Sequence, residues 1–451
     1  MFLLWMLFFS YYTYAELSFS PNKDSLKDST QKVLQAINGD EKSIAQVNIR
    51  VQGAQIRNFR LYSDFSFAGL NAANKKLAEE IKSKIEKDLA LVSGFEIVKS
   101  VKSPTIELLK QQGVEGKIDI SFKFTQNSVS IELKAFNLIN NQYINKTIES
   151  TNSNNRIHHH IAKAIFDMFI GQEDIFLRQI AAIKTQNNKQ QIVLMDFDGN
   201  NQKIITQDNW PKISPSFSPD GKSLFYAVIT EQGHGIIEHD LVSGKRVFRT
   251  KTIGVNMEPK IHPNNSCMIA SLSLEKATNL YKANRDGSNL TKITQSLGMN
   301  LSAFINQKGD KIVYVSDRSG NPQIYLQNIN AKCDLEGSAK RLTFVGNYNQ
   351  NPSLSNDDSY VVFVGRDENK VFDIFLIELS NLKVSRITQN QGVNKSPIFS
   401  TSSRYVLFSS QRNSDNNSHI YISNLSGNNQ MKITSDNASY DSFAINPILL
   451  Q

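Results

Sequence analysis

The chain has 451 residues, of which 40% are apolar and 20% charged, and it carries a net charge of +8. This length allows two or more domains with cores of their own, and the composition is that of a globular protein. The Lys and Arg residues are scattered, often beside Asp or Glu, and no Arg-rich or aromatic-basic motif occurs. The positive charge therefore does not indicate nucleic-acid binding.

Two cysteines, Cys267 and Cys333, exclude a disulfide-dense scaffold. Cys267 opens an apolar strand, whereas Cys333 stands in an outer turn. We expect two free thiols rather than a bridge, because the two positions are not obviously neighbours.

The N-terminal segment 1–15, MFLLWMLFFSYYTYA, is apolar and turns polar at Glu16. It is too short to span a bilayer comfortably, and Ala15 offers a small residue for cleavage, so we expect an export signal. No Lys or Arg stands near Met1, which leaves a retained anchor or a start further upstream as alternatives. Residues 16–46 are polar and predict a tether.

Residues 47–171 have the pattern of a small α/β domain. Leu77, Ile81, Ile85 and Leu89 recur every four residues and predict an amphipathic helix over Asn71–Val92. A second amphipathic helix is expected over Ile157–Ile170, and a short one over Pro104–Gln111. The expected strands are Val47–Val51, Phe59–Tyr62, Phe95–Val98, Ile118–Phe124, Val129–Phe136 and Tyr143–Ile148.

Residues 172–451 repeat one pattern of four short strands. A large apolar residue that ends the first strand recurs at intervals of 43 to 50 residues, and a Lys/Arg-Ile-Thr mark keeps the same spacing. Four strands in a period of roughly 40–50 residues are typical of a propeller blade. The recurring apolar residues are Phe217, Ile261, Phe304, Leu354, Phe399 and Phe443.

The number of repeats predicts how the ring closes. Five units are complete, beginning near Ser214, Pro259, Ser302, Pro352 and Pro397. Ile180–Thr206 contains three strands without a first one, and Ser442–Ile445 is a first strand with nothing after it. Pairing of the two ends would complete a sixth blade and leave no open sheet edge. The predicted fold is a six-bladed β-propeller preceded by a small α/β domain.

Three adjacent histidines, His158, His159 and His160, invite a metal-site interpretation. Adjacent residues of a helix point about 100° apart, so the three cannot converge on one ion. Asp196, Asp198 and Asp286 fit ordinary hairpin turns, with only a weak case for calcium. We therefore expect no metal and no cofactor.

Catalytic motifs are also missing from the sequence. It contains no Gly-x-Ser-x-Gly elbow, no phosphate-binding loop and no His-Glu-x-x-His. Some peptidases carry a similar propeller in front of a hydrolase domain, but here the chain ends at Gln451, directly after the closing strand. We expect a protein that is not an enzyme and has no catalytic residues, and whose propeller presents loops to another protein.

The junction between the two parts resembles the TolB family of the Tol-Pal cell-envelope system. The resemblance covers about Val47 to the C-terminus, and its most specific parts are Ile165–Gly171 running into Phe176–Ile183, then Met195–Gln202 and Ser214–Gly221. It implies a monomeric, non-enzymatic periplasmic adaptor that supports outer-membrane integrity, cell division and protein transport. The implied partners are the peptidoglycan-associated lipoprotein Pal, which would hold it at the outer membrane, and TolA.

The resemblance also implies which residues bind these partners. A tail with Val47, Ile49 and Val51 would bind TolA, although the polar run at 16–46 precedes it here. Pal would bind the loops that enter the innermost strands and share one rim of the channel, where a small apolar centre lies within a polar ring. We expect changes of Val255 or Glu258 to weaken this contact while leaving the melting temperature nearly intact. The expected contact residues are Trp210, Val255, Asn256, Met257, Glu258, Met299, Asn300, Asn349, Asn394 and Tyr440.

Two alternatives remain open from the residues alone. One is an exported propeller that binds a glycan or a peptide, which would need aromatic residues in the channel. The other is a hydrolase with an unrecognised site, which would need a nucleophile or convergent carboxylates there.

Overall fold

The computed structural model describes residues 58–450 except 93, 100–103, 152–155, 253, 275–276, 296–297, 345, 367–370 and 413–415. The expected export signal at 1–15, the tether at 16–46 and the tail strand Val47–Val51 lie outside the described residues. Within the described part, no helix combines the length and the apolar character needed to cross a membrane.

A five-stranded mixed sheet forms the first part, with the strand order β2-β1-β3-β4-β5. β1 pairs in parallel with β2 and β3, while β4 pairs antiparallel with β3 and β5. Burial alternates along β3, where Ile118, Ile120 and Phe122 face the core, because successive side chains of a strand point to opposite faces. The strands are β1 (Phe59–Ser66), β2 (Phe95–Ile97), β3 (Gly116–Phe124), β4 (Ser128–Asn137) and β5 (Gln142–Thr151).

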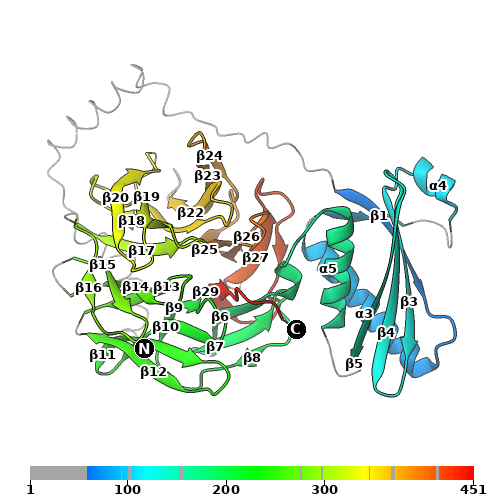
Figure 1. The fold of residues 1–451 in the computed structure, drawn as a ribbon, viewed down its shortest axis with the longest axis horizontal. Helices are drawn as coiled ribbons and strands as arrows, with labels where there is room; N and C mark the ends of the chain where they lie inside the picture. The colour runs from blue at the N-terminus through cyan, green and yellow to red at the C-terminus, as the bar shows by residue number, and fades with distance from the viewer. Residues whose placement is uncertain are drawn as a thin grey trace. The chain divides into compact units, whose positions relative to one another are not determined.

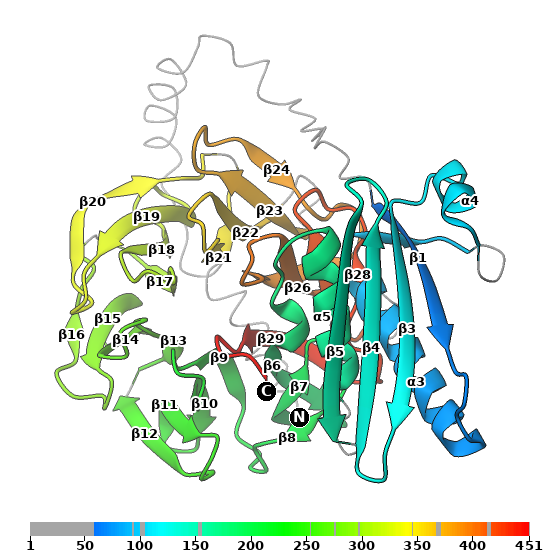
Figure 2. The same ribbon diagram turned by 45° about the vertical axis from the view of Figure 1, so that its right-hand side comes forward.

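Two helices, α3 (Ala72–Leu91) and α5 (Ile157–Phe169), lie side by side against one face of this sheet (Figures 1 and 2). α3 begins after Asn71, whose side-chain oxygen accepts the backbone N–H of Asn74 at 2.9 Å. Its apolar residues at every fourth position are buried, as the sequence predicts. A short helix, α4 (Ile106–Gln111), confirms the third expected helix.

The hydrophobic core of this α/β part continues into the propeller. Phe166 of α5 packs against Phe176 in the short 3-10 helix η2 (Ile175–Leu177), with ring centroids 5.5 Å apart. The same cluster of buried residues reaches Ile180 and Tyr440 in the propeller. The expected connection at Gly171–Leu177 is therefore a packed junction.

Six four-stranded antiparallel sheets follow and surround a central channel (Figure 1). The five complete units of the sequence each form one sheet. Their strands are β9 (Lys212–Phe217), β10 (Ser223–Thr230), β11 (Gly233–Asp240) and β12 (Arg246–Thr252); β13 (Asn256–Ile261), β14 (Cys267–Leu272), β15 (Asn279–Asn284) and β16 (Thr291–Lys292); β17 (Asn300–Ile305), β18 (Lys311–Ser316), β19 (Gln323–Ile329) and β20 (Leu335–Arg341); β21 (Asn349–Leu354), β22 (Tyr360–Arg366), β23 (Phe372–Glu378) and β24 (Val384–Arg386); β25 (Val393–Phe399), β26 (Tyr405–Gln411), β27 (His419–Asn424) and β28 (Met431–Lys432).

The sixth sheet joins the two ends of the propeller, as predicted. Its order is β29-β6-β7-β8, so the last strand of the chain is its innermost strand. Phe443 of β29 lies opposite Ala182 of β6, and Ile445 lies opposite Ile180. This pairing closes the ring and leaves neither terminal strand as an unpaired edge. The strands are β6 (Gln179–Gln186), β7 (Lys189–Asp196), β8 (Lys203–Ile204) and β29 (Ser439–Ile445).

The Lys/Arg-Ile-Thr mark has a structural role in five blades. The threonine follows the end of the fourth strand. Its hydroxyl accepts a backbone N–H of the third strand that lies beyond the end of the fourth strand's pairing. These bonds are Ile192 to Thr206 at 2.8 Å, Leu280 to Thr294 at 3.2 Å, Ile324 to Thr343 at 2.9 Å, Ile374 to Thr388 at 2.9 Å and Ile420 to Thr434 at 3.1 Å.

The expectation of two free thiols is wrong, because Cys267 and Cys333 form a disulfide with a Cα–Cα distance of 6.3 Å. Cys267 begins β14, and Cys333 lies in the turn after β19 of the next blade. That turn folds back over the neighbouring blade, where the hydroxyl of Ser266 donates to the carbonyl of Ala331 at 3.0 Å. The sequence did not reveal this proximity because the two cysteines are 66 positions apart in the chain.

Candidate functional site

The innermost strand of each blade carries an irregularity beside the channel. Its pairing with the second strand shifts register at the same place in all six blades. In five of them the residue at the shift has a positive φ, which costs a non-glycine residue about 1 kcal/mol or more. Because the strain recurs at one place in the repeat, it belongs to the fold. These residues are Ser214 (53°), Glu258 (55°), Ser302 (55°), Asn351 (48°) and Ser396 (50°).

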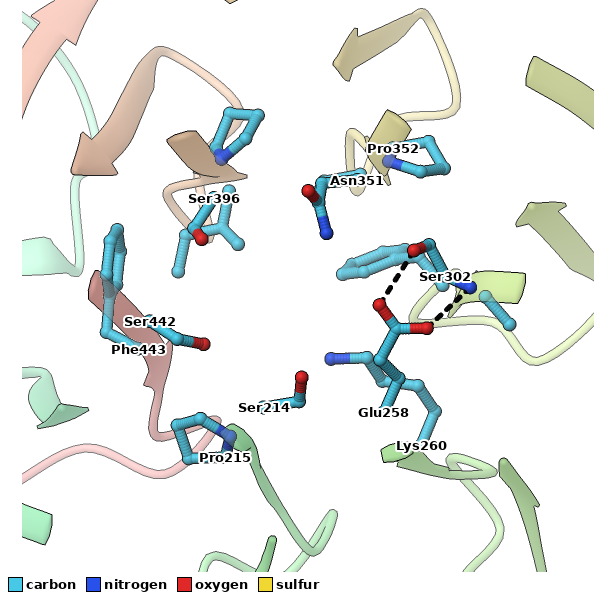
Figure 3. Close-up of a pocket in the computed structure, with 15 residues that line it drawn as sticks. Ser214, Pro215, Glu258, Lys260, Ser302, Asn351, Pro352, Ser396, Ser442 and Phe443 are labelled. Carbon is cyan, nitrogen blue, oxygen red and sulfur yellow. Dashed lines mark hydrogen bonds between the residues drawn. The ribbon is translucent and has the colours of Figure 1, made fainter. Parts of the chain in front are cut away.

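These five residues and Ser442 face a polar cavity of about 70 Å³ in the channel (Figure 3). Six of its lining residues have hydroxyl or amide side chains and seven are apolar, while Glu258 and Lys260 are its charged side chains. Phe304 and Phe443 are its aromatic members. The cavity is large enough for several waters.

The carboxylate of Glu258 is held by the neighbouring blade (Figure 3). It accepts the backbone N–H of Ser302 at 2.6 Å and the Ser302 hydroxyl at 2.7 Å. The hydroxyl of Ser271 donates to it at 2.9 Å. Glu258 is therefore a link between two blades as well as part of the channel wall.

Lys260 points toward the middle of the same cavity (Figure 3). Burial lowers the pKa of its ammonium group, and the nearby Glu258 carboxylate works in the opposite direction. Lys260 was not among the residues expected from the sequence, although its position one residue before the end of the innermost strand β13 could have indicated a side chain in the channel.

Four of the expected contact residues are buried asparagines at the start of innermost strands. Asn256, Asn300, Asn349 and Asn394 are at most 2% exposed. Their amides bind other parts of the propeller: that of Asn300 donates to Asn279 Oδ1 at 3.0 Å, and that of Asn349 to Gln323 Oε1 at 3.0 Å. Recurrence at one place in the repeat was a sign of this structural role, since a partner contact does not have to repeat in every blade.

The larger expected contact residues divide into two groups. Trp210, Val255 and Met299 are half-buried and lie just before the innermost strands β9, β13 and β17, at the end of the blades where these strands begin. Met257 and Tyr440 are buried, at 5% and 0% exposure. The Tyr440 hydroxyl donates to Asp436 Oδ2 at 2.9 Å, so this side chain is engaged inside the protein.

Three arginines at the same end of the blades were not among the residues expected from the sequence. Arg318, Arg366 and Arg412 each stand at or just after the end of a second strand, in three successive blades. Each guanidinium lies over an aromatic ring: Arg318 over Tyr325 at 4.6 Å, Arg366 over Phe372 at 5.8 Å and Arg412 over Tyr421 at 4.1 Å. We use the term rim for Trp210, Val255, Met299, Arg318, Arg366 and Arg412.

The three adjacent histidines separate, as the helix geometry requires. His160 lines a different pocket with Lys146 and Lys163, whereas His158 and His159 turn toward Asp88 of α3. Asp196 and Asp198 of the propeller also face His159. Asp198 still makes the expected turn bond, to the N–H of Asn200 at 3.0 Å, but Asp196 is fully buried beside Arg156.

Burial and neighbouring charges shift the pKa values of this group. Burial lowers the pKa of His158 to about 3 and raises that of Asp88 to about 6. Burial alone would lower the pKa of His159, but the carboxylates of Asp196 and Asp88 raise it to about 9. Burial also opposes ionisation of Asp196, yet His159 and Arg156 lower its pKa below the usual range.

Comparison with known proteins gives a consistent result. A family model described as the TolB beta propeller domain matches residues 166–372. The Tol-Pal system protein TolB of Francisella tularensis subsp. mediasiatica is 24% identical over 412 residues, which cover 88% of this chain and 89% of that protein. The protein of the same name from Francisella tularensis subsp. tularensis is 25% identical over 62% of this chain, and the alignment spans 66% of its length, just under two thirds.

A solved structure shares the fold of nearly the whole described chain. The crystal structure of TolB from Acinetobacter baumannii superimposes with a TM-score of 0.76 at 20% identity. The match covers 87% of this chain and 97% of the other.

Proposed function

Because this chain belongs to the TolB family, we propose that it is a non-enzymatic periplasmic adaptor of the Tol-Pal system. In this proposal it supports outer-membrane integrity and envelope constriction during cell division. Its partners are the peptidoglycan-associated lipoprotein Pal, bound by the rim, and TolA, bound by the tail that contains Val47, Ile49 and Val51. The names of the relatives support membership of the Tol-Pal system, and the residues of the rim support a role in protein binding.

The chemistry of the rim is the observation that carries the lipoprotein contact. Its three half-buried apolar side chains lie on three successive blades, and its three arginines, each stacked on an aromatic ring, lie on the third of these blades and the next two. Arginine and tryptophan are enriched where protein interfaces gain most of their binding energy. Arginine forks also pair well with carboxylates. The rim therefore suits a partner surface with an apolar patch beside acidic residues.

The channel favours binding over catalysis. A glycosidase of the usual kind needs two carboxyl groups flanking the bond to be cleaved. Among the described residues that line the cavity, Glu258 is the only carboxylate, and three donors already hold it. The cavity therefore offers no pair of carboxyl groups to share the acid and base roles.

The test is a binding titration of the purified lipoprotein domain against matched valine variants. Val255→Asp places a charge on the rim, whereas Val242→Asp places the same charge in the β11–β12 turn, where Val242 is 85% exposed. We expect Val255→Asp to weaken binding at least tenfold and Val242→Asp to bind like the wild type, with both variants keeping the circular-dichroism spectrum of the parent. Equal affinity of the two folded variants would reject the rim as the contact surface.

The tail is tested separately. We expect a chain that starts at residue 52 to lose TolA binding while it keeps its affinity for the lipoprotein, because the rim is built by the propeller alone. Undiminished TolA capture by the shortened chain would contradict the assignment of Val47, Ile49 and Val51.

A further inference from the structure

Two helices bring three potential metal ligands together in a buried place. Asp88 of α3 is 0% exposed, and His158 and His159 of α5 are 2% and 0% exposed. One ligand atom of each residue lies within 4.8 Å of the other two. His159 Nδ1 is 2.7 Å and His158 Nε2 is 3.9 Å from Asp88 Oδ2. Ligand atoms bound to one zinc ion at about 2.0–2.2 Å stand roughly 3–4 Å apart, so shifts of less than about 1 Å would place all three on one ion.

Three atoms of this group are buried without a hydrogen-bond partner among the described residues. They are His158 Nε2, His159 Nε2 and Asp88 Oδ1. Buried polar atoms of native proteins almost always have a partner, and an atom without one points to an ion or water at that place. All three atoms belong to side chains that already approach one another.

Two carboxylates lie near the second ring nitrogen of His159, where the outer shell of a metal site would be. Its other ring nitrogen, Nε2, lies 3.6 Å from Asp196 Oδ2 and 4.0 Å from Asp198 Oδ1. Asp196 is itself held by Arg156 Nε at 2.9 Å and by the Asn201 amide at 2.6 Å. A metal-bound histidine normally donates its second N–H to a carboxylate that is fixed in this way, because the contact orients the ring.

The charges at this place also favour a cation. The carboxylates of Asp88, Asp196 and Asp198 all lie near His159, and Arg156 forms an ion pair with Asp196. Buried carboxylates are stable only when their charge is compensated. Imidazole nitrogens combined with a carboxylate oxygen form a donor set that suits Zn²⁺ and similar transition-metal ions better than Ca²⁺ or Mg²⁺.

We propose that Asp88, His158 and His159 bind one divalent transition-metal ion of the zinc class, with Asp196 orienting His159 from the propeller. The ion connects α3 and α5 directly and contacts the propeller through that carboxylate, so it fastens the α/β part to the ring. Three adjacent histidines of one helix still cannot bind the same ion. In this site α5 supplies only two ligands, and Asp88 of α3 supplies the third.

The experiment uses the full exported chain, purified without a histidine tag and treated with a chelator. Titration with CoCl₂ is followed by visible absorption, because cobalt in a four-coordinate nitrogen and oxygen site has a distinctive spectrum, and ZnCl₂ is then added as a competitor. We expect one cobalt ion per chain, displaced by one equivalent of zinc. Zinc at about a hundredfold excess over its Kd should raise the melting temperature by about 2–4 °C.

Matched variants of the histidine run assign the site. His158→Ala removes a ligand, and His158→Phe removes it while filling the space, so that one of the two is expected to fold normally. We expect both to lose the cobalt spectrum and the zinc-dependent rise in melting temperature. His160→Ala, on the same helix but facing Lys146 and Lys163, should retain both.

Three results would overturn the proposal. They are the absence of stoichiometric cobalt or zinc binding by the wild type, unchanged binding by a folded His158 variant, and equal loss of binding in His160→Ala. If the wild type binds neither ion, a protonated His159 and not a metal balances the charge of the Asp88 carboxylate.

Discussion

Glu258 and Ser302 join two neighbouring blades at the wall of the channel: the carboxylate accepts both the backbone N–H and the hydroxyl of Ser302, at 2.6 and 2.7 Å. Both residues have a positive φ, of 55° each. The same contact therefore fixes two strained positions of adjacent innermost strands. A side chain that the sequence suggested as a partner contact is first of all part of the ring.

This contact predicts that Glu258→Ala destabilises the propeller. Hydrogen bonds to a charged group contribute about 1.5–3 kcal/mol each, and the loss leaves the donors of Ser302 and Ser271 buried without this acceptor. We expect the free energy of unfolding to fall by about 2–4 kcal/mol, which differs from the nearly intact melting temperature expected from sequence. Glu258→Gln keeps one acceptor oxygen and should lose less. Chemical denaturation measures both, with the exposed Glu231→Gln as the neutral comparison.

The rim arginines predict a salt-dependent contact. Arg412→Gln should weaken lipoprotein binding several-fold at low ionic strength, and the difference from the wild type should shrink as NaCl is raised, because salt screens charge pairs beyond about 10 Å at 0.1 M. Lys245→Gln removes an exposed charge from the β11–β12 turn and serves as the control. An Arg412 effect that stays constant from low to high salt would argue against pairing with acidic groups.

Closure of the ring predicts that the last strand is indispensable. Removing residues 439–451 deletes β29, exposes the inner edge of β6 and takes Phe443, which is 4% exposed, out of the core. A large buried apolar side chain contributes about 1.5–3 kcal/mol, and a whole strand ladder is lost with it. We expect the shortened chain to melt far below the parent, or to fail to fold. Ile448→Ala, at a 48% exposed position beyond the strand, should change little.

Asp358 predicts a stability loss in acid. Burial alone would raise the pKa of Asp358, but bonds from Lys308, Asn306 and Lys311 outweigh it and lower the pKa to about 2. Since the ordinary pKa of Asp is about 3.9, the unfolded chain binds this proton first. The stabilisation is therefore complete above about pH 5 and is lost as the pH falls toward 2.

The measurement for Asp358 compares thermal melting of the wild type and Asp358→Asn between pH 7 and pH 2. We expect the variant to melt lower at pH 7 and the two curves to converge near pH 2. Asp286→Asn is the control, because Asp286 lies in an outer turn and accepts only local bonds from Ser288. A constant difference across this pH range would show that the ion pairs with Lys308 and Lys311 are not its source.

Much of the architecture could be predicted because it is encoded locally. Each blade is specified by short apolar strands and turn residues within about 45 residues, so repetition of the pattern reveals both the number of blades and the missing first strand of the sixth. The α3 pattern was equally readable, since Ile81, Ile85 and Leu89 lie on one helix face. The closure of the ring could be predicted because the repeat is incomplete at both ends of the propeller sequence.

The sites depend on contacts between distant parts of the chain, and these the sequence does not display. Cys267 meets Cys333 across 66 residues, and Asp88 meets His159 across 71. The rim acquires its arginines because the end of a second strand lies beside the start of the first, as for Asn300 and Ser316. The sequence by itself determined the repeat, the blade count and the helices, because local spacing controls which faces are buried. Only the tertiary structure decided that Asn300 is buried, that Arg318 is exposed, and that two helices and a propeller turn place their ionisable groups together.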